Sequence, residues 1–441
     1  MNKIKLLLLI FGLLNISVSI AQTAEPTGTI EIRAKAENLT GMANSGSEGI
    51  VSGLRIAALP ILRPGEIMEM VPGLIVTQHA GDGKANQYFL RGFNLDHGTD
   101  FATYVNGVPA NMPTHAHGQG YTDLNFLIPE LVDLIAYKKG TYSAMDGDFS
   151  AAGSARLEYR KSLDGHLAEV TAGANGYKRL LLAGSPKRQD GQWLYGLEVF
   201  KNDGPWLVPE NYQKLNGVLS YSDGTRLNGY SVTGMLYKSS WISTDQVPLR
   251  AINQGLIGRF GSLDPTTGGE THRYSVSSQW AQTGKDRQTK ANFWALDSAL
   301  DLWSNFEYCT GSIEKTGNCA AGDQFKQAEK RKAFGFGLSE ARYHQLSLLN
   351  SKYESAFTFG VDGRSDHIFP VGLYKTTRRA VTETVREDAV TQSSVSLWAQ
   401  NEIRWTSTIR SIVGARADAY QFDVKSNLAA NSGKASDQKV S

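Results

Sequence analysis

Histidine is the residue type whose placement offers the clearest chemistry in this sequence. Five of the eight histidines fall between residues 79 and 166. His115 and His117 stand two residues apart, which places both imidazoles on the same side of an extended segment. Asp96, His97 and Asp100 come one hairpin earlier. Imidazole with carboxylate suits Zn, Cu, Ni or Fe, so these side chains predict a site for a metal ion or metal chelate. The alternative is that His115 and His117 only bond the backbone of their own loop.

Other chemistry is not indicated by the sequence. It contains no nucleophile elbow, no phosphate-binding loop and no zincin pattern. The 45 Lys and Arg residues nearly balance the 43 Asp and Glu residues, so no basic field is available for nucleic acid. We therefore expect neither an enzyme nor a nucleic-acid-binding protein, and we expect no required cofactor.

The first residues indicate export. Lys3 and Lys5 precede an apolar stretch over residues 6–16, and the small residues Ser19 and Ala21 offer a cleavage site. This pattern predicts a signal peptide over residues 1–21, with a short membrane anchor as the alternative.

Export also makes a disulfide permissible. The two cysteines of the chain, Cys309 and Cys319, lie ten residues apart in a polar segment that contains glycine. A disulfide that closes a loop is the natural expectation, and two free thiols remain the alternative because spacing does not prove pairing.

The elements that must position the histidines follow a polar segment. Residues 22–53 are rich in Gly, Ser and Ala and predict a flexible arm. One short extended stretch within the arm alternates β-branched residues, which would add to the open edge of a partner's sheet or form an ordinary edge strand. That stretch is Thr29, Ile30, Glu31, Ile32, Arg33 and Ala34.

A small mixed domain comes next, over residues 54–160. It combines a helix-like stretch at 64–70 with strand-like stretches at 74–77 and 88–91. The five candidate metal ligands all lie in this α+β domain.

From residue 161 onwards the signals are those of strands. About eleven strand-like runs follow, and brief connections broadly alternate with longer ones at about 240–270, 303–330 and 367–388. Short turns on one side and long loops on the other are typical of bacterial outer-membrane barrels. The expected runs are 163–174, 177–185, 192–202, 213–221, 227–239, 271–281, 287–302, 331–345, 351–366, 389–404 and 408–423.

Alternation within the better runs supports a barrel. Val395 and Leu397 oppose Trp398, and the alanines of 413–419 oppose Arg416 and Asp418. An Arg facing lipid near the midplane would cost about 2–4 kcal/mol, so Arg416 is expected to face the lumen. A half-buried strand of a soluble protein remains the alternative for any single run.

Four segments of the mixed domain resemble, in order, the plug of TonB-dependent receptors. Glycines at two of them suit turns with positive φ, and a proline at the first ends a helix. The charge of Arg91 would need a partner inside a plugged lumen, either a carboxylate or the substrate. The segments are Glu66 to Val76 with Val71, Pro72 and Gly73; Phe89 to Phe93 with Arg91 and Gly92; Tyr104 to Pro109 with Asn106 and Gly107; and Leu131 to Ser154.

The resemblance implies a plug inside a 22-stranded antiparallel transmembrane β-barrel. Since about eleven runs are counted over residues 161–441 and the chain ends in a polar stretch at 432–441, we expect the N-terminal half of a barrel, truncated within a loop.

The resemblance also implies a function: active uptake of a scarce nutrient across the bacterial outer membrane. A metal ion, a metal chelate or a siderophore is the expected substrate, and outer-membrane lipid surrounds the barrel. TonB, with its inner-membrane energising complex, would pull on a box for which residues 29–34 are the candidate. A passive outer-membrane channel and an exported metal-binding protein remain the alternatives.

Overall fold

Strands dominate the computed structural model, which describes residues 42–78, 80–186, 191–243, 245–306, 323–348 and 351–441. The expected signal peptide, the candidate box at residues 29–34, His79 and both cysteines lie outside the described residues, so those expectations stay predictions. Among the described residues no helix combines the length and the apolar character that crossing a membrane would require.

The N-terminal domain is built on two small sheets. Its larger sheet has the order β1-β2-β8-β9-β6-β7, in which β6 and β9 run parallel and the other neighbours antiparallel. The strands are β1 (Met42–Ser45), β2 (Glu48–Ser52), β6 (Phe101–Val105), β7 (Val108–Pro109), β8 (Val132–Lys139) and β9 (Gly153–Tyr159). The smaller sheet consists of β3 (Leu74–Thr77), β4 (Gln87–Leu90) and β5 (Phe93–Asn94). Short helices connect them, namely α1 (Gly53–Ala57), η2 (Pro64–Met70) and η3 (Pro129–Leu131).

This domain begins earlier than the sequence predicted. Residues 42–52, expected in the flexible arm 22–53, form β1 and β2, and β2 pairs with β8 from Glu48 opposite Lys138 to Ser52 opposite Leu134. The arm expectation is therefore wrong for these residues. A strand of five residues shows too little alternation to be recognised in the sequence. It forms because its pairing with β8 stabilises it through backbone hydrogen bonds.

The expected turns are present where the motifs placed them. Helix η2 ends just before Pro72, and Gly73 and Gly92 have φ of +87° and +85°. Asn106 and Gly107 join β6 to β7 with φ of +46° and +77°, which matches the two positive φ values of a type I′ turn.

Arg91 differs from its expected role. Its side chain is exposed, and it makes no ion pair with any described residue. Its backbone N–H donates to the carbonyl of Gly73 at 2.9 Å, and its φ of +51° places it in the turn between β4 and β5. The expectation that Arg91 is a charge paired inside the protein is therefore wrong for the described residues.

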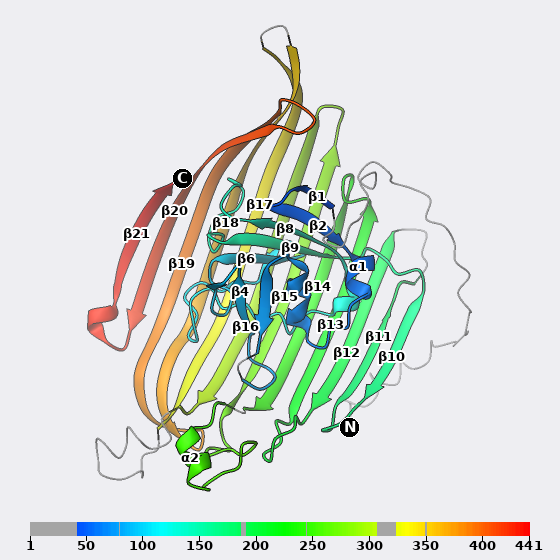
Figure 1. Ribbon diagram of the computed structural model, residues 1–441. Helices are drawn as coiled ribbons and strands as arrows, with labels where there is room; N and C mark the ends of the chain where they lie inside the picture. Colours follow the sequence, from blue (N-terminus) through cyan, green and yellow to red (C-terminus); the bar gives the residue numbers. More distant parts are fainter. Residues whose placement is uncertain (1–41, 79, 187–190, 244, 307–322, 349–350) are drawn as a thin grey trace, which may run out of the picture. The chain divides into compact units, whose positions relative to one another are not determined.

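The second body is a sheet of twelve antiparallel strands, ordered β10 to β21 with each strand paired to the next (Figure 1). Its strands are β10 (His166–Ala172), β11 (Lys178–Gly184), β12 (Gln192–Asn202), β13 (Tyr212–Gly224), β14 (Gly229–Ile242), β15 (Gly268–Thr283), β16 (Arg287–Ser304), β17 (Gln324–Leu348), β18 (Ser351–Thr377), β19 (Ala380–Arg404), β20 (Arg410–Ser426) and β21 (Gly433–Val440). The remaining short helices are α2 (Leu249–Asn253) and η4 (Ala429–Asn431).

Two expected loops are strands instead. The long connection expected at 367–388 is a turn at Arg378 and Arg379, because β18 runs on to Thr377 and β19 begins at Ala380. Pro370 and the charges around it hide the strand pattern, and a register shift between Ile368 and Val371 accommodates the proline.

The polar stretch 432–441 was expected to lie in a loop. Residues 433–440 instead form β21, which pairs with β20 from Val424 opposite Gly433 to Ala417 opposite Val440. All eight side chains of β21 are exposed, so no burial pattern marks this strand in the sequence.

The alternation predicted for the sheet is confirmed. Val395 and Leu397 are 52% and 63% exposed, whereas Trp398 is 5% exposed. Arg416 and Asp418 are 8% and 9% exposed, and the Nε of Arg416 donates to Asp418 at 2.8 Å. We call the face with the exposed apolar residues the outward face and the opposite one the inward face.

The N-terminal domain packs against the inward face. One hydrophobic core contains Leu131 and Leu157 from this domain together with Leu181, Leu194 and Tyr237 from the large sheet. The longer connections that follow β12 and β14 lie at one end of the sheet, together with α2 (Figure 1), and the short turns that follow β13 and β15 lie at the other. We call these the long-loop end and the short-turn end.

Candidate functional site

Side chains of β17 hold the loop that carries two of the predicted histidines. The Gln327 Nε2 donates to the carbonyl of Ala116 at 3.0 Å, and a Glu329 carboxylate oxygen accepts from the Ala116 N–H at 3.1 Å. Arg331 donates to the carbonyl of Pro113 at 2.6 Å. Because β17 starts at the long-loop end, this contact lies towards that end of the sheet.

His97 and His117 meet at the centre of the site. Their Nε2 atoms lie 3.1 Å apart and their ring centroids 4.8 Å apart. The Nδ1 of His97 lies 3.1 Å from each of the carbonyl oxygens of Ala85 and Asn86. A carbonyl oxygen can only accept, so in the neutral ring the proton sits on Nδ1 and the lone pair on Nε2.

His117 is held in the same tautomer. Its Nδ1 lies 2.8 Å from the Oε1 of Gln327, and the orientation of that amide is set because its Nε2 donates to Ala116. The Nδ1 of His117 therefore donates, and its Nε2 also carries a lone pair. Two lone pairs thus face each other across the 3.1 Å gap.

Two imidazoles whose Nε2 atoms lie this close could share a metal ion. Ligand histidines commonly donate their second ring N–H to a carbonyl or amide oxygen, which fixes the tautomer and raises the basicity of the ligand nitrogen. Two nitrogens bound at about 2.0 Å to one tetrahedral Zn²⁺ would lie about 3.3 Å apart, close to the separation found here.

Both histidines are kept neutral by their surroundings. Burial lowers the pKa of His117 to about 3, with the Lys84 ammonium as the next cause. Burial likewise lowers the pKa of His97. Neutral imidazole is the form that binds a metal, so the folded site needs to release few protons on binding.

His115 does not join this pair, although its spacing predicted that it would. Its Nδ1 accepts from the backbone N–H of His117 at 3.2 Å, its Nε2 lies 3.6 Å from Glu329, and its ring stacks on Tyr121 at an interplanar angle of 1°. The ring of His117 lies at an interplanar angle of 85° to Tyr121, so the two imidazole rings have different orientations. The segment is a bend rather than a strand, and Thr114 has a φ of +52°. His115 therefore bonds the backbone of its own loop and also lies close to Glu329 of β17.

The two predicted carboxylate ligands, Asp96 and Asp100, lie in different places. An Asp96 oxygen lies 3.9 Å from the Nε2 of His97, while Asp100 lines a different cavity together with Lys138 and Glu402. In the described part of the chain no three His, Cys, Asp or Glu side chains form a metal-binding group. The pair could therefore supply two protein ligands, and water or the ligands of a chelate would have to fill the other coordination positions.

Two members of the site were not predicted. Tyr121 contacts all three imidazoles through its ring, and its hydroxyl accepts from the Ala85 N–H at 3.0 Å. Gln327 lies 210 residues from His117 in the sequence. Tyr121 could have been suspected from its closeness to the His-Ala-His segment, whereas only the fold brings Gln327 to it.

Comparison with known proteins identifies the N-terminal domain. Residues 41–154 match the TonB-dependent Receptor Plug Domain family. Among solved structures, the unliganded ferric citrate transporter FecA is similar with a TM-score of 0.67 at 11% identity, covering 90% of this chain and 59% of that one. The copper transporter OprC follows with 0.64 at 15%, covering 91% and 60%.

A third similar structure is the ferric yersiniabactin uptake receptor FyuA from Yersinia pestis, with a TM-score of 0.63 at 13% identity and coverages of 89% and 60%. The chain thus spans about three fifths of the length of these structures. A TonB-dependent receptor plug domain, followed by antiparallel strands of the receptor barrel fold, makes up the described part of this chain.

Proposed function

We propose that this chain belongs to an outer-membrane receptor that takes up a metal ion or a metal chelate with energy delivered by TonB. In this account His97 and His117 receive the metal through their Nε2 atoms. The proposal depends on one observation: the Nε2 atoms of His97 and His117 lie 3.1 Å apart. In each ring an oxygen acceptor holds the proton on Nδ1, which leaves the lone pair on Nε2.

The position of the pair suits a receptor. Barrels of this class carry long loops outside and short turns in the periplasm. Gln327, which orients His117, lies near the start of β17, at the long-loop end. A ligand that enters from outside would therefore meet the pair before the rest of the plug. The candidate box at residues 29–34 would act as the handle for TonB on the periplasmic side.

The electrostatics favour a metal that arrives with anionic ligands. The Lys84 ammonium is buried and is one cause of the low pKa of His117. A positive charge near the pair attracts a negatively charged chelate. The similar structures are transporters or receptors of ferric citrate, copper and ferric yersiniabactin, a range that fits this class of substrate.

Uptake by cells that carry the intact receptor tests the proposal. In His97→Asn with His117→Asn, each Asn amide nitrogen takes the place of Nδ1 and keeps the hydrogen bond to oxygen, while the ligand nitrogen is lost. We expect metal-limited growth and accumulation of Zn²⁺ or of its citrate complex to fall to the level of a receptor deletion. The control is His166→Asn with His344→Asn, two exposed histidines of the large sheet.

Uptake that is unchanged in the double Asn variant would overturn the proposal. Uptake that persists when the TonB system is inactivated would instead indicate a passive channel, and metal binding without any accumulation would indicate an exported metal-binding protein.

A further inference from the structure

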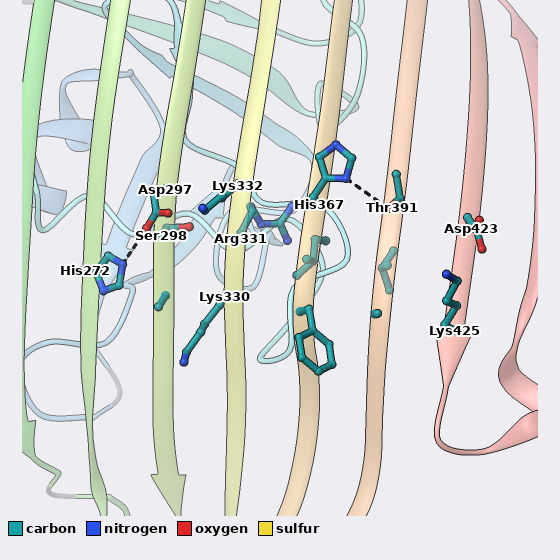
Figure 2. A pocket seen from close by; sticks show the side chains of 15 residues that line it. His272, Asp297, Ser298, Lys330, Arg331, Lys332, His367, Thr391, Asp423 and Lys425 are labelled. Atoms are coloured by element: carbon teal, nitrogen blue, oxygen red, sulfur yellow. Dashed lines mark hydrogen bonds and ion pairs between the residues drawn. The ribbon is translucent and has the colours of Figure 1, made fainter.

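A second polar site lies on the outward face of the large sheet, away from the plug. It is a hollow of about 490 Å³ across strands β15 to β20. Its charged and imidazole side chains are shown in Figure 2 and include His272, Asp297, Lys330, Lys332, His367, Asp423 and Lys425.

Strand pairing shows that these side chains share the outward face. Lys332 lies opposite Asp297 on one side and opposite His367 on the other. Between Lys330 and Lys332, Arg331 points the other way, is 1% exposed and binds the plug. The outward face at this point is therefore distinct from the metal site.

A bulge at Phe369 and Pro370 of β18 accompanies the hollow and shifts the register with both neighbouring strands. The register shifts between Glu329 and Arg331 where β17 meets β18, and between Ile368 and Val371 where β18 meets β19. Such bulges bend a strand and change the direction of its side chains. Phe369, within the second shift, is 60% exposed and forms part of the wall.

The three lysines are available for an anion. In the part of the chain that the structure describes, no carboxylate lies within ion-pair distance of Lys330, Lys332 or Lys425. The two aspartates of the hollow have other partners: Asp297 lies 3.0 Å from the Nε2 of His272, and Asp423 lies 3.6 Å from the Nζ of Lys434. Lys330 and Lys332 extend between β16 and β17 in Figure 2.

The hollow lies where the apolar part of the outward face ends. On β17, Phe334 and Leu338 are 55% and 40% exposed and follow Lys330 and Lys332 at alternate positions. On β20, exposed alanines precede Asp423 and Lys425. On both strands the charged residues lie on the long-loop side of the apolar stretch.

We propose that this hollow binds the phosphate of a lipid headgroup. The inference rests on the proposed function in one respect, because the apolar outward band must face lipid. Polar residues at the edge of such a band lie at the depth of the headgroups. Clustered lysines attract anionic headgroups, at about fivefold in affinity for each lysine near the surface. Phe334, which follows Lys332 on the apolar side of the hollow, offers apolar contact to the lipid beneath the phosphate.

The test uses the intact receptor in phosphatidylcholine vesicles that contain phosphatidic acid, with native mass spectrometry to count the phosphatidic acid that stays bound after extraction. For Lys330→Gln with Lys332→Gln we expect about a thirtyfold loss of bound phosphatidic acid. Lys285→Gln with Lys352→Gln removes the same charge at the short-turn end and should leave binding unchanged.

Equal retention by both double variants would overturn the proposal. Inorganic phosphate that binds at these lysines in detergent, with no phosphatidic acid retained from vesicles, would overturn the lipid source and indicate a free-phosphate site. Zn²⁺ affinity measured on the same samples separates the two proposals, because the lysine variants leave His97 and His117 intact.

Discussion

His97 and His117 face each other through Nε2 atoms 3.1 Å apart, and an oxygen acceptor holds the proton of each ring on Nδ1. A hydrogen bond between the two Nε2 atoms would need one ring to move its proton. That ring would then turn a lone pair towards an oxygen behind it. In the proposed site, a metal ion bound by both Nε2 atoms would remove this conflict.

Replacement of Gln327 by Met tests the orienting contact. This change removes the acceptor behind His117 while keeping the length of the side chain, so we expect Zn²⁺ affinity to fall about 10- to 100-fold in titration calorimetry of the intact receptor. The control is Gln392→Met, because Gln392 binds Thr114 of the same loop at 2.6 Å and does not contact the histidine pair through any described hydrogen bond. An equal loss in both variants would assign the effect to the loop rather than to His117.

Metal binding should depend less on pH between 7 and 5 than binding to two ordinary imidazoles would. Burial holds the pKa of His117 at about 3 and lowers that of His97, so His117 is already deprotonated in the folded protein over this range. Two ordinary imidazoles would release about two protons per metal at pH 5. Calorimetry in buffers of different ionisation enthalpy should find a release of at most about one proton, and a release near two would contradict the burial argument.

The lowered pKa of His117 also predicts how the stability of the folded protein depends on pH. The unfolded chain takes up a proton on His117 as the pH falls below about 6.5, whereas the folded chain does so only near pH 3. The unfolded state therefore binds more protons in this window, and the free energy of unfolding should decrease from pH 6.5 towards pH 3. His117→Asn should show a smaller decrease than the wild type in urea titrations, and an unchanged slope would contradict this assignment.

Arg331 should contribute more to stability than the exposed arginine of the same strand. Its side chain is 0% exposed and forms ion pairs with Glu329 and Asp366. Arg331→Met leaves these carboxylates buried with fewer partners, at a cost of about 3–5 kcal/mol. Arg342→Met breaks an exposed pair with Glu340 and should leave the free energy of unfolding almost unchanged. Urea unfolding in detergent compares the two variants, and similar costs would show that Arg331 does not hold the plug loop.

Deletion of residues 29–34 should separate binding from transport. If this stretch is the TonB box, the deletion abolishes accumulation of the metal and leaves the Zn²⁺ affinity of the purified receptor unchanged. Normal accumulation would show that TonB engages another part of the chain.

The faces of the sheet could be predicted from the sequence, because the period of two survives in single strands. In β19, for example, Val395 and Leu397 are exposed whereas Trp398 is buried. Where the strands begin and end could not be predicted from the sequence. β21 has eight exposed side chains, and β18 continues past Pro370 through a register shift, so pairing with neighbours rather than local pattern determines where these strands run.

The candidate site was predicted in part. His97 and His117 are of a residue type that ligates metals, and both lie in the mixed domain predicted over residues 54–160. The i, i+2 argument failed for His115 because Thr114 adopts a positive φ and bends the segment. Gln327 could not be predicted, since its position opposite His117 follows from how the plug packs against β17.

X-ray absorption spectroscopy of the intact receptor with one equivalent of Zn²⁺ is the most direct test of the histidine pair. We predict scattering from two imidazoles with Zn–N distances of about 2.0–2.1 Å, lost in His97→Asn with His117→Asn and retained in His166→Asn with His344→Asn. Imidazole scattering that is absent from the wild type, or unchanged in the His97 and His117 variant, would contradict the account.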